Sequence, residues 1–284
     1  MIRRTVPQKT ISKQISLSGV GLHTGKHVNI TFKPAPADTG LVFVRDDVDG
    51  DNLINAHIKY ISNTDRGTNL DNGLFRIHTS EHVLAAITGL DIDNCFICLD
   101  GPEVPIMDGS SKFFINALEQ AKIVEQNVLR EEFFPSEPIS YLCEDTGSKI
   151  SILPDDNYRV NTLVDYKTRV LGEQEASINH ISEFKKEISS ARTFSFLHEL
   201  ETLLENGLIK GGDLNNAIVY VDKPLAESNM EILKKAFNKE SISVTPNGIL
   251  DNLDLHYPNE AARHKLLDVI GDLALIGMKI RGKV

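Results

Sequence analysis

Short apolar runs, many of them alternating with polar residues, fill most of the first 60 residues, and turn-forming residues separate them. Val28–Phe32 and Leu41–Val44 are two of the predicted strands, because a repeat of two residues is typical of strands that bury one face. Farther on, His82–Leu90 has its apolar residues at helical spacing, and a buried strand is expected at residues 94–99. Strands combined with helices in this way predict an α+β fold.

The rest of the chain continues this succession. The expected elements are a helix at about Ser111–Gln126, strands near residues 148–153, 158–165 and 216–221, a Leu-rich helix at about 195–206 and a long helix from about Pro258. The segment 127–138 is charged and contains two prolines, so we place the domain boundary there. The predicted domains are an N-terminal one at residues 1–127 and a C-terminal one at residues 128–284.

Two short stretches in the two halves match in spacing. The first is His82-x-Leu84 followed by Gly89, and the second is His264-x-Leu266 followed by Gly271. Each histidine thus begins a predicted helix that is ended or interrupted by glycine. The match indicates a duplicated α+β unit.

Charge and apolar patterning limit the partners of the chain. Its 30 basic and 40 acidic residues give a net charge of −10, which disfavours broad binding to nucleic acid or to an anionic membrane. An anionic small molecule fits if Lys and Arg cluster locally. The N-terminus has no apolar signal-peptide region, and no apolar stretch approaches the ~18 residues that span a bilayer. The chain is therefore expected to be soluble and cytoplasmic, without stable membrane insertion.

The three cysteines are an odd number, which argues against a disulfide framework. Cys95 and Cys98 form a C-x-x-C pattern, which is compatible with zinc or redox chemistry. They fall in the predicted strand at residues 94–99, where residues three apart point to opposite faces. We therefore predict two inert buried thiols.

The predicted helix at about 260–276 carries a polar stripe. His264, Asp268 and Asp272 fall within an arc of about 80°, with Lys265 at its margin. A histidine and an aspartate four residues apart can converge on one metal ion. A solvated polar face explains the same pattern, so both interpretations stay open at this point.

A second candidate site lies at the start of the first predicted helix. His78, Glu81 and His82 fit the pattern H-x-x-E-H, in which two histidines bind zinc beside a general-base glutamate. This interpretation predicts a peptidase. An ordinary helix N-terminus explains the pattern equally well, because Thr79 and Ser80 are natural residues of a first turn.

Five motifs, in order along nearly the whole chain, resemble one family. They are Gly19–Gly25, Thr79–His82, Pro102–Ser110, Ser190–Phe194 and Arg263–Leu273. Together they resemble UDP-3-O-acyl-N-acetylglucosamine deacetylase, the zinc amidase of lipid A biosynthesis, which serves lipopolysaccharide synthesis in Gram-negative bacteria. The resemblance implies two similar α+β domains, each a β-sheet packed against α-helices, with the active site at their interface.

The resemblance also implies the residues of the site. The Zn²⁺ ligands are His82, His264 and Asp268, which leaves a fourth position for water and excludes His78. The implied catalytic residues are Glu81 as general base, Thr193 as oxyanion stabiliser, and Asp272, which in the family orients a general acid. The implied substrate-binding residues are Lys265, Phe194 and Thr193, with an insert at about 194–222 for the acyl chain. We add Arg192 and Lys210 as candidates for binding the diphosphate.

One departure from the family concerns the general acid. Beyond the strand Met278–Val284 the family continues into a Gly-His motif whose histidine is the proposed acid, whereas the last histidine here is His264. We interpret the chain as truncated at its C-terminus and expect it to bind zinc but to hydrolyse slowly or not at all. Some members are fused to a C-terminal acyl-carrier-protein dehydratase, so such a fusion is expected here as well.

The leading hypothesis is therefore zinc-dependent hydrolysis of the N-acetyl group of UDP-3-O-acyl-N-acetylglucosamine, the committed step of lipid A biosynthesis. Its partner is a small molecule, the acylated UDP-sugar, and not nucleic acid. One alternative is a zinc metallopeptidase of the H-x-x-E-H type, which requires His78 as a ligand. Another is a catalytically impaired module that binds a sugar nucleotide or an acyl group.

Overall fold

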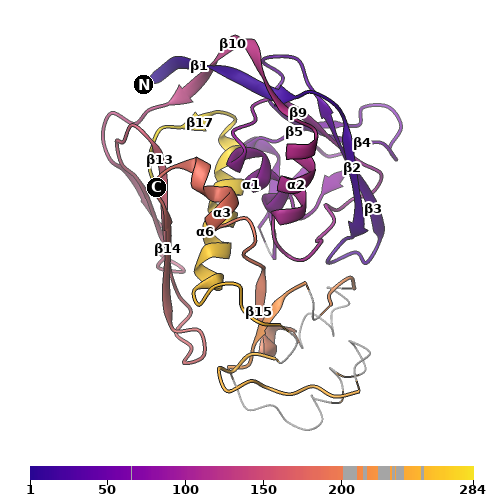
Figure 1. Cartoon of the computed structure of the whole chain (residues 1–284), viewed down its shortest axis with the longest axis vertical. Helices are drawn as coiled ribbons and strands as arrows, with labels where there is room; N and C mark the ends of the chain where they lie inside the picture. The colour runs from indigo at the N-terminus through magenta and orange to yellow at the C-terminus, as the bar shows by residue number, and fades with distance from the viewer. Residues whose placement is uncertain are drawn as a thin grey trace.

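The computed structural model describes residues 1–284 except 65, 201–209, 214–215, 223–230, 232–233, 235–239 and 251–252. In the described residues, strands form sheets that pack against helices (Figure 1). This arrangement confirms the predicted α+β class.

The largest described sheet has the strand order β2-β3-β9-β4-β5. Its strands are β2 (Ile15–Val20), β3 (His27–Pro34), β9 (Cys95–Leu99), β4 (Leu41–Arg45) and β5 (Leu53–Asn55). In β3, the buried Val28, Ile30 and Phe32 alternate with more exposed residues, as the repeat of two predicts. The central β9 pairs with β3 on one side and β4 on the other and is buried along most of its length. For this reason it is a continuous apolar run rather than an alternating one.

Two helices lie in the middle of the molecule. Figure 1 shows α6 (Glu260–Leu273) running beside α1 (Glu81–Gly89), with β13 (Tyr158–Asp165) and β14 (Glu173–Ile178) on the far side of α6. A third helix, α2 (Lys112–Gln120), contacts α1 and β2. All nine residues of α1 are buried, so this helix is the centre of the core.

The remaining strands form smaller sheets. Their members are β1 (Ile2–Ile11), β10 (Ile123–Phe133) and β17 (Lys279–Ile280); β13 (Tyr158–Asp165), β14 (Glu173–Ile178) and β18 (Gly282–Lys283); β11 (Ile139–Leu142) and β12 (Lys149–Ile152); β15 (Phe194–Phe196) and β16 (Ile218–Tyr220); and β6 (Ile61–Asn63), β7 (Asn69–Asp71) and β8 (Arg76–Ile77). The short helices are η1 (Ile58–Tyr60), η2 (Ile181–Glu183), α3 (Phe184–Glu187) and η3 (Ala274–Ile276).

Most of the predicted elements are confirmed, but three differ. The single strand predicted at Met278–Val284 is instead two short strands, β17 paired with β10 and β18 paired with β13. The helix predicted at 111–126 ends at Gln120, because Lys122 has a φ of 57° and β10 begins at Ile123. In the helix predicted at 195–206, residues 195–196 instead belong to strand β15, residues 197–200 are helical as predicted, and residues 201–206 lie outside the described residues. The predicted domain boundary between residues 127 and 128 falls within β10 and stays a prediction.

The cysteines behave as predicted from their position. Cys95 and Cys98 are buried and free, and burial raises the pKa of Cys95 to about 12. Its thiol therefore stays protonated and unreactive at neutral pH. Among the helices in the described part of the chain, none is long and apolar enough to span a membrane.

Candidate metal centre and its cleft

The site forms where α1 and α6 approach closely, and Gly271 permits this approach. A Cβ atom at Gly271 would lie 2.1 Å from the carbonyl oxygen of Glu81, so only glycine fits at this crossing. As a result, His82 of α1 faces His264 of α6, with ring centroids 5.0 Å apart and the planes at 88°. The matched glycine spacing in the sequence thus includes a residue that brings the two histidines together.

Three side chains at this crossing present their ligand atoms to one point. The candidate ligand atoms of His82, His264 and Asp268 all lie within 4.8 Å of one another. Oδ1 of Asp268 is 3.4 Å from Nε2 of His264 and 3.8 Å from Nε2 of His82. This oxygen is buried and has no hydrogen-bond partner. An unpaired buried carboxylate oxygen is costly unless a cation binds it, so the residues fit a metal ion.

The protonation states of these three side chains also suit a cation. Burial, together with the adjacent His264, lowers the pKa of His82 to about 3, and burial lowers the pKa of His264. Burial alone would raise the pKa of Asp268, but Lys265 and the two histidines lower it to about 2. Neutral imidazoles and an ionised carboxylate are the forms that bind a metal ion.

Neighbouring groups orient the candidate ligands. Nδ1 of His264 lies 3.1 Å from the carbonyl oxygen of Ala191, a contact that requires this nitrogen to carry the proton and leaves Nε2 with its lone pair. Lys265 donates a hydrogen bond of 2.9 Å to Oδ2 of Asp268. On the polar stripe of α6, His264 is buried and Asp268 is largely buried at the cleft, whereas Asp272 is exposed to solvent.

Glu81 lies beside this group. Its Oε2 accepts a 2.9 Å hydrogen bond from the backbone N–H of Thr68. Burial, with the charges of Asp268 and Asp272, raises the pKa of Glu81 to about 8 in the metal-free protein. The hydroxyl of Thr68 donates to Asp272 at 2.6 Å, and burial raises the pKa of Asp272 to about 6. A bound cation would lower both pKa values, because it favours the ionised carboxylates.

Thr193 and Phe194 form the opposite wall. The backbone of Thr193 is fixed on both sides, since its N–H donates to Gly109 and its carbonyl accepts from Ile218. The ring of Phe194 packs edge-on against His264, with centroids 6.4 Å apart. The Lys265 ammonium lies 5.6 Å from the centre of the same ring.

A cavity of about 620 Å³ opens between these walls. All eight site residues that the resemblance implies line it: Glu81, His82, Thr193, Phe194, His264, Lys265, Asp268 and Asp272. Sequence reasoning missed Thr68, Tyr166 and His23 as lining residues. His23 belongs to the motif Gly19–Gly25, which was a usable signal, whereas nothing in the local sequence marks Thr68 or Tyr166.

His78, the remaining candidate for a metal ligand, does not belong to the metal site. His78 lies before the helix, because Thr79 has a φ of 58° and α1 begins at Glu81. Its Nδ1 contacts the side-chain oxygen of Asn69 at 3.0 Å, and it is not in the metal-ligand group found among the described residues. The peptidase hypothesis, which requires His78 as a ligand, is therefore wrong.

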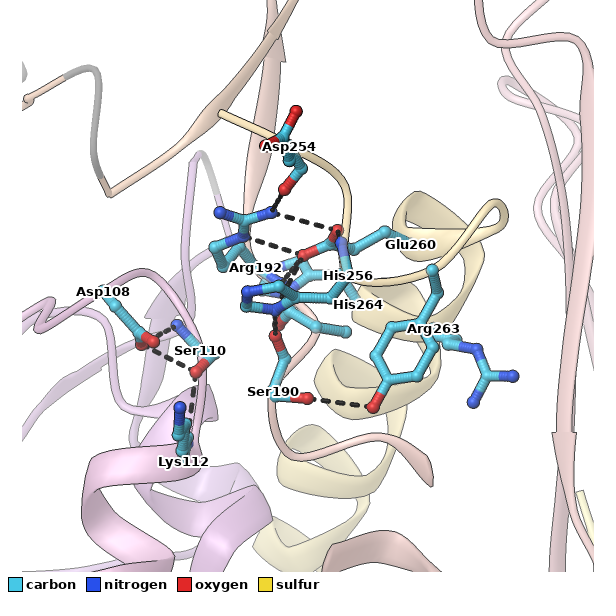
Figure 2. Close-up of polar contacts among 12 residues, drawn as sticks. Asp108, Ser110, Lys112, Ser190, Arg192, Asp254, His256, Glu260, Arg263 and His264 are labelled. Atoms are coloured by element: carbon cyan, nitrogen blue, oxygen red, sulfur yellow. Dashed lines mark hydrogen bonds and ion pairs between the residues drawn. The ribbon is translucent and has the colours of Figure 1, made fainter. Parts of the chain in front are cut away.

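Arg192 does not bind substrate either. Its guanidinium is buried and occupied by Glu260 and by the carbonyl of Asp254 (Figure 2). Lys210, the other candidate for the diphosphate, is exposed, and its role stays a prediction.

Comparisons with known proteins agree with the geometry. The chain matches the family model described as LpxC, UDP-3-O-acyl N-acetylglycosamine deacetylase, over residues 8–234 and 228–284. It is 44% identical over 282 residues to the bifunctional enzyme LpxC/FabZ of Chlorobaculum tepidum. The aligned residues are 98% of this chain and 60% of that protein. The bifunctional enzyme LpxC/FabZ of Bacteroides thetaiotaomicron is 41% identical over 277 residues, with the same two coverages.

A relative of shorter length is also similar. The UDP-3-O-acyl-N-acetylglucosamine deacetylase of Acidithiobacillus ferrooxidans is 37% identical over 280 residues, 98% of this chain and 84% of that protein. The chain thus spans about 60% of the length of the bifunctional relatives and most of the length of this one.

Proposed function

Because the chain belongs to the UDP-3-O-acyl-N-acetylglucosamine deacetylase family, we propose that it removes the N-acetyl group of UDP-3-O-acyl-N-acetylglucosamine by zinc-dependent hydrolysis, in lipid A biosynthesis. One observation carries the proposal. The unpaired Oδ1 of Asp268 lies beside Nε2 of two buried, neutral histidines, and the Glu81 carboxyl group, whose pKa burial raises to about 8, lines the same cavity. This is the set of groups that metal-assisted amide hydrolysis requires.

Zinc is the proposed metal. Two imidazole nitrogens and one carboxylate oxygen are ligands that zinc takes at catalytic sites, where three protein ligands leave a further position open. A bound zinc ion would supply Lewis acidity to a water molecule and to the acetamide carbonyl. His82, His264 and Asp268 would hold it, with Nε2 as the ligand atom of His264 because its Nδ1 faces the carbonyl of Ala191.

Glu81 is the proposed general base. It takes a proton from the attacking water as the water oxygen bonds to the carbonyl carbon, and that proton is then available to the amide nitrogen when the C–N bond breaks. The products are acetate and a free amine. The Thr68 N–H holds the Glu81 carboxylate in place, and the Thr68 hydroxyl holds Asp272. We propose that Asp272 supports catalysis through this connection.

Thr193 is the proposed oxyanion stabiliser. Its backbone is fixed by two hydrogen bonds, so the side-chain hydroxyl can be presented to the developing negative charge without reorganisation. Lys265 and Phe194 are the proposed substrate contacts beside it. The Lys265 ammonium supplies positive charge within an acidic chain, and the Phe194 ring offers an apolar surface.

The acyl chain is proposed to lie along the insert at about 194–222. In its described part, Phe194 contacts the rings of Tyr166, Phe196 and Tyr220 at centroid distances of 5.6 to 6.3 Å. Leu200 and Val219 also line the cavity. An apolar wall next to a metal centre suits a substrate that has both a polar head and a hydrocarbon tail.

The test is acetate release from the acylated UDP-sugar by the zinc-loaded protein, with Glu81→Gln as the matched variant. We expect slow acetate release by the parent protein, in line with the expectation from the sequence, and far less by the variant. Binding of the UDP-sugar without acetate release would instead support the alternative of an impaired binding module.

We also propose a fusion to a dehydratase domain and a location in the cytoplasm. The bifunctional LpxC/FabZ relatives support the predicted fusion to a dehydratase domain, which assays of dehydratase activity in the natural gene product would test. The cytoplasm is the proposed location, and fractionation of the host cell would test it.

A further inference from the structure

A buried ion pair lies behind the candidate metal centre and takes no part in the proposed chemistry. Arg192 and Glu260 are 5% and 0% exposed. Glu260 accepts hydrogen bonds from the backbone N–H of Arg192 at 3.0 Å, from its Nε at 2.9 Å and from its Nη2 at 3.2 Å. Figure 2 shows the guanidinium between Glu260 and Asp254, whose carbonyl accepts from Nη2 at 2.6 Å.

The pair joins two segments that each supply part of the site. Glu260 is the first residue of α6, one helical turn before His264. On the other segment, Arg192 lies between Ala191, whose carbonyl faces Nδ1 of His264, and Thr193, whose backbone is fixed at the cleft. A displacement of Arg192 relative to α6 therefore moves both the Ala191 carbonyl and Thr193.

Other contacts reinforce this connection. The backbone N–H of His256 donates to Oε2 of Glu260 at 2.6 Å, and Nδ1 of His256 lies 2.9 Å from the carbonyl of Ser190. The Ser190 hydroxyl contacts the Tyr257 hydroxyl at 2.9 Å. The segment that precedes Thr193 is thus tied to the start of α6 by a network whose centre is the Glu260 carboxylate.

A buried ion pair seldom adds net stability compared with apolar residues of the same volume. Here the ion pair instead fixes an orientation, because a planar guanidinium bound to two fixed acceptors has only one orientation. We propose that Arg192 and Glu260 are positioning residues that set the orientation of the His264 imidazole through the Ala191 carbonyl and set the position of Thr193. The proposal rests on the proposed function in taking His264 as a metal ligand.

The test compares two conservative substitutions, Arg192→Lys and Arg130→Lys. Arg130 is the matched control, since it is 4% exposed and pairs with Asp91 and Asp93 but is not a residue of the cavity wall. A lysine keeps the charge at each position and loses the two-pronged geometry. The readouts are zinc affinity, measured by competition with a chromophoric chelator, and the visible absorption spectrum of the Co²⁺-substituted protein.

We expect Arg192→Lys to weaken zinc binding about 10- to 100-fold, as loss of a group that orients a metal ligand does, and to change the Co²⁺ spectrum. Arg130→Lys is expected to leave both unchanged, although it lowers the melting temperature. A purely structural role for Arg192 would lower the melting temperature alone. The proposal would be overturned if the Arg192→Lys variant had the same zinc affinity and the same Co²⁺ spectrum as the Arg130→Lys variant.

A second variant covers the case in which Arg192→Lys does not fold. In the double variant Arg192→Met with Glu260→Gln, no charge is buried without a partner. The single Gln oxygen accepts from one of the two backbone N–H groups, of residues 192 and 256, that donate to the two Glu260 oxygens. We expect this variant to fold and to show the same loss of zinc affinity, and unchanged affinity would overturn the proposal. Absence of acetate release from the zinc-loaded parent protein would overturn the proposed function instead.

Discussion

Replacement of Gly271 by alanine tests the helix crossing on which the site depends. The added Cβ would lie 2.1 Å from the carbonyl oxygen and 2.9 Å from the carbonyl carbon of Glu81, and these are backbone atoms that cannot rotate away. Since real Cβ contacts are essentially never shorter than 3.0 Å, α1 and α6 must separate locally by about 0.9 Å. His82 directly follows Glu81, and Asp268 lies one turn before Gly271.

The size of this displacement decides the outcome for the metal. Zinc–ligand distances tolerate changes of about 0.2 Å, so a separation several times larger removes His82 from the common ligand point. We expect zinc affinity to fall at least tenfold, which removes about 1.4 kcal/mol or more of the stabilisation by zinc. The strain itself costs about 1–3 kcal/mol, partly offset by the lower entropy of an unfolded chain with alanine.

The assay is chelator competition for zinc, together with thermal unfolding of the metal-free and zinc-loaded protein. Gly89→Ala is the matched control, because a Cβ there also meets an atom at 2.1 Å, but that atom belongs to the Phe184 ring. This control should lose stability and keep its zinc affinity. Equal zinc affinities for the two variants would refute the reasoning from the helix crossing.

Three further predictions follow from the site and the core. Glu81→Gln should lower the rate of acetate release about 10²- to 10⁴-fold, as loss of a general base does, while zinc content measured by atomic absorption stays the same. The metal-free protein should lose stability as the pH falls from about 4 towards 3, because His82 and Asp268 have pKa values lowered to about 3 and about 2 in the fold, so that protonation favours the unfolded chain. Above about pH 4 the raised pKa values of Glu81 and Asp272 act in the opposite direction. Urea unfolding at several pH values should show a slope of up to about 1.4 kcal/mol per pH unit for each of His82 and Asp268 between about pH 4 and 3, and a flat profile there would contradict it. A thiol reagent should modify only Cys143 in the native protein, since the other two cysteines are buried, and labelling of more than one thiol before unfolding would argue against this.

The sequence predicted best those elements whose pattern is local. The apolar spacing of His82–Leu90 and the alternation in Val28–Phe32 became α1 and β3. The predicted end of the second helix at Gln126 was wrong, because pairing with β1, more than 100 residues away, makes Ile123–Phe133 a strand. Such long-range pairing leaves no periodic signal within the segment itself.

The candidate metal site was likewise predicted where its pattern is local and missed where residues meet only through the fold. The spacing of His264 and Asp268 on one helix and the pattern that contains His82 were both visible in the sequence, but only the resemblance grouped the three residues. The pattern H-x-x-E-H misled because it assumes a helix from His78 onward, whereas Thr79 has a positive φ. Neither the bond from Thr68 to Glu81 nor the pair of Arg192 and Glu260 could be predicted, because each joins residues that meet only in the folded chain.

The matched histidine-to-glycine spacing leads to one site rather than two because the two helices carry different neighbours of their histidines. On α1, Glu81 precedes His82, and the buried Ala86 occupies the position four residues later. On α6, the corresponding order is reversed, since Arg263 precedes His264 and Asp268 follows it four residues later. Arg263 turns away to Asn259 and Glu187. One helix therefore carries one proposed ligand and the proposed base, the other carries two proposed ligands, and neither helix alone has a complete set.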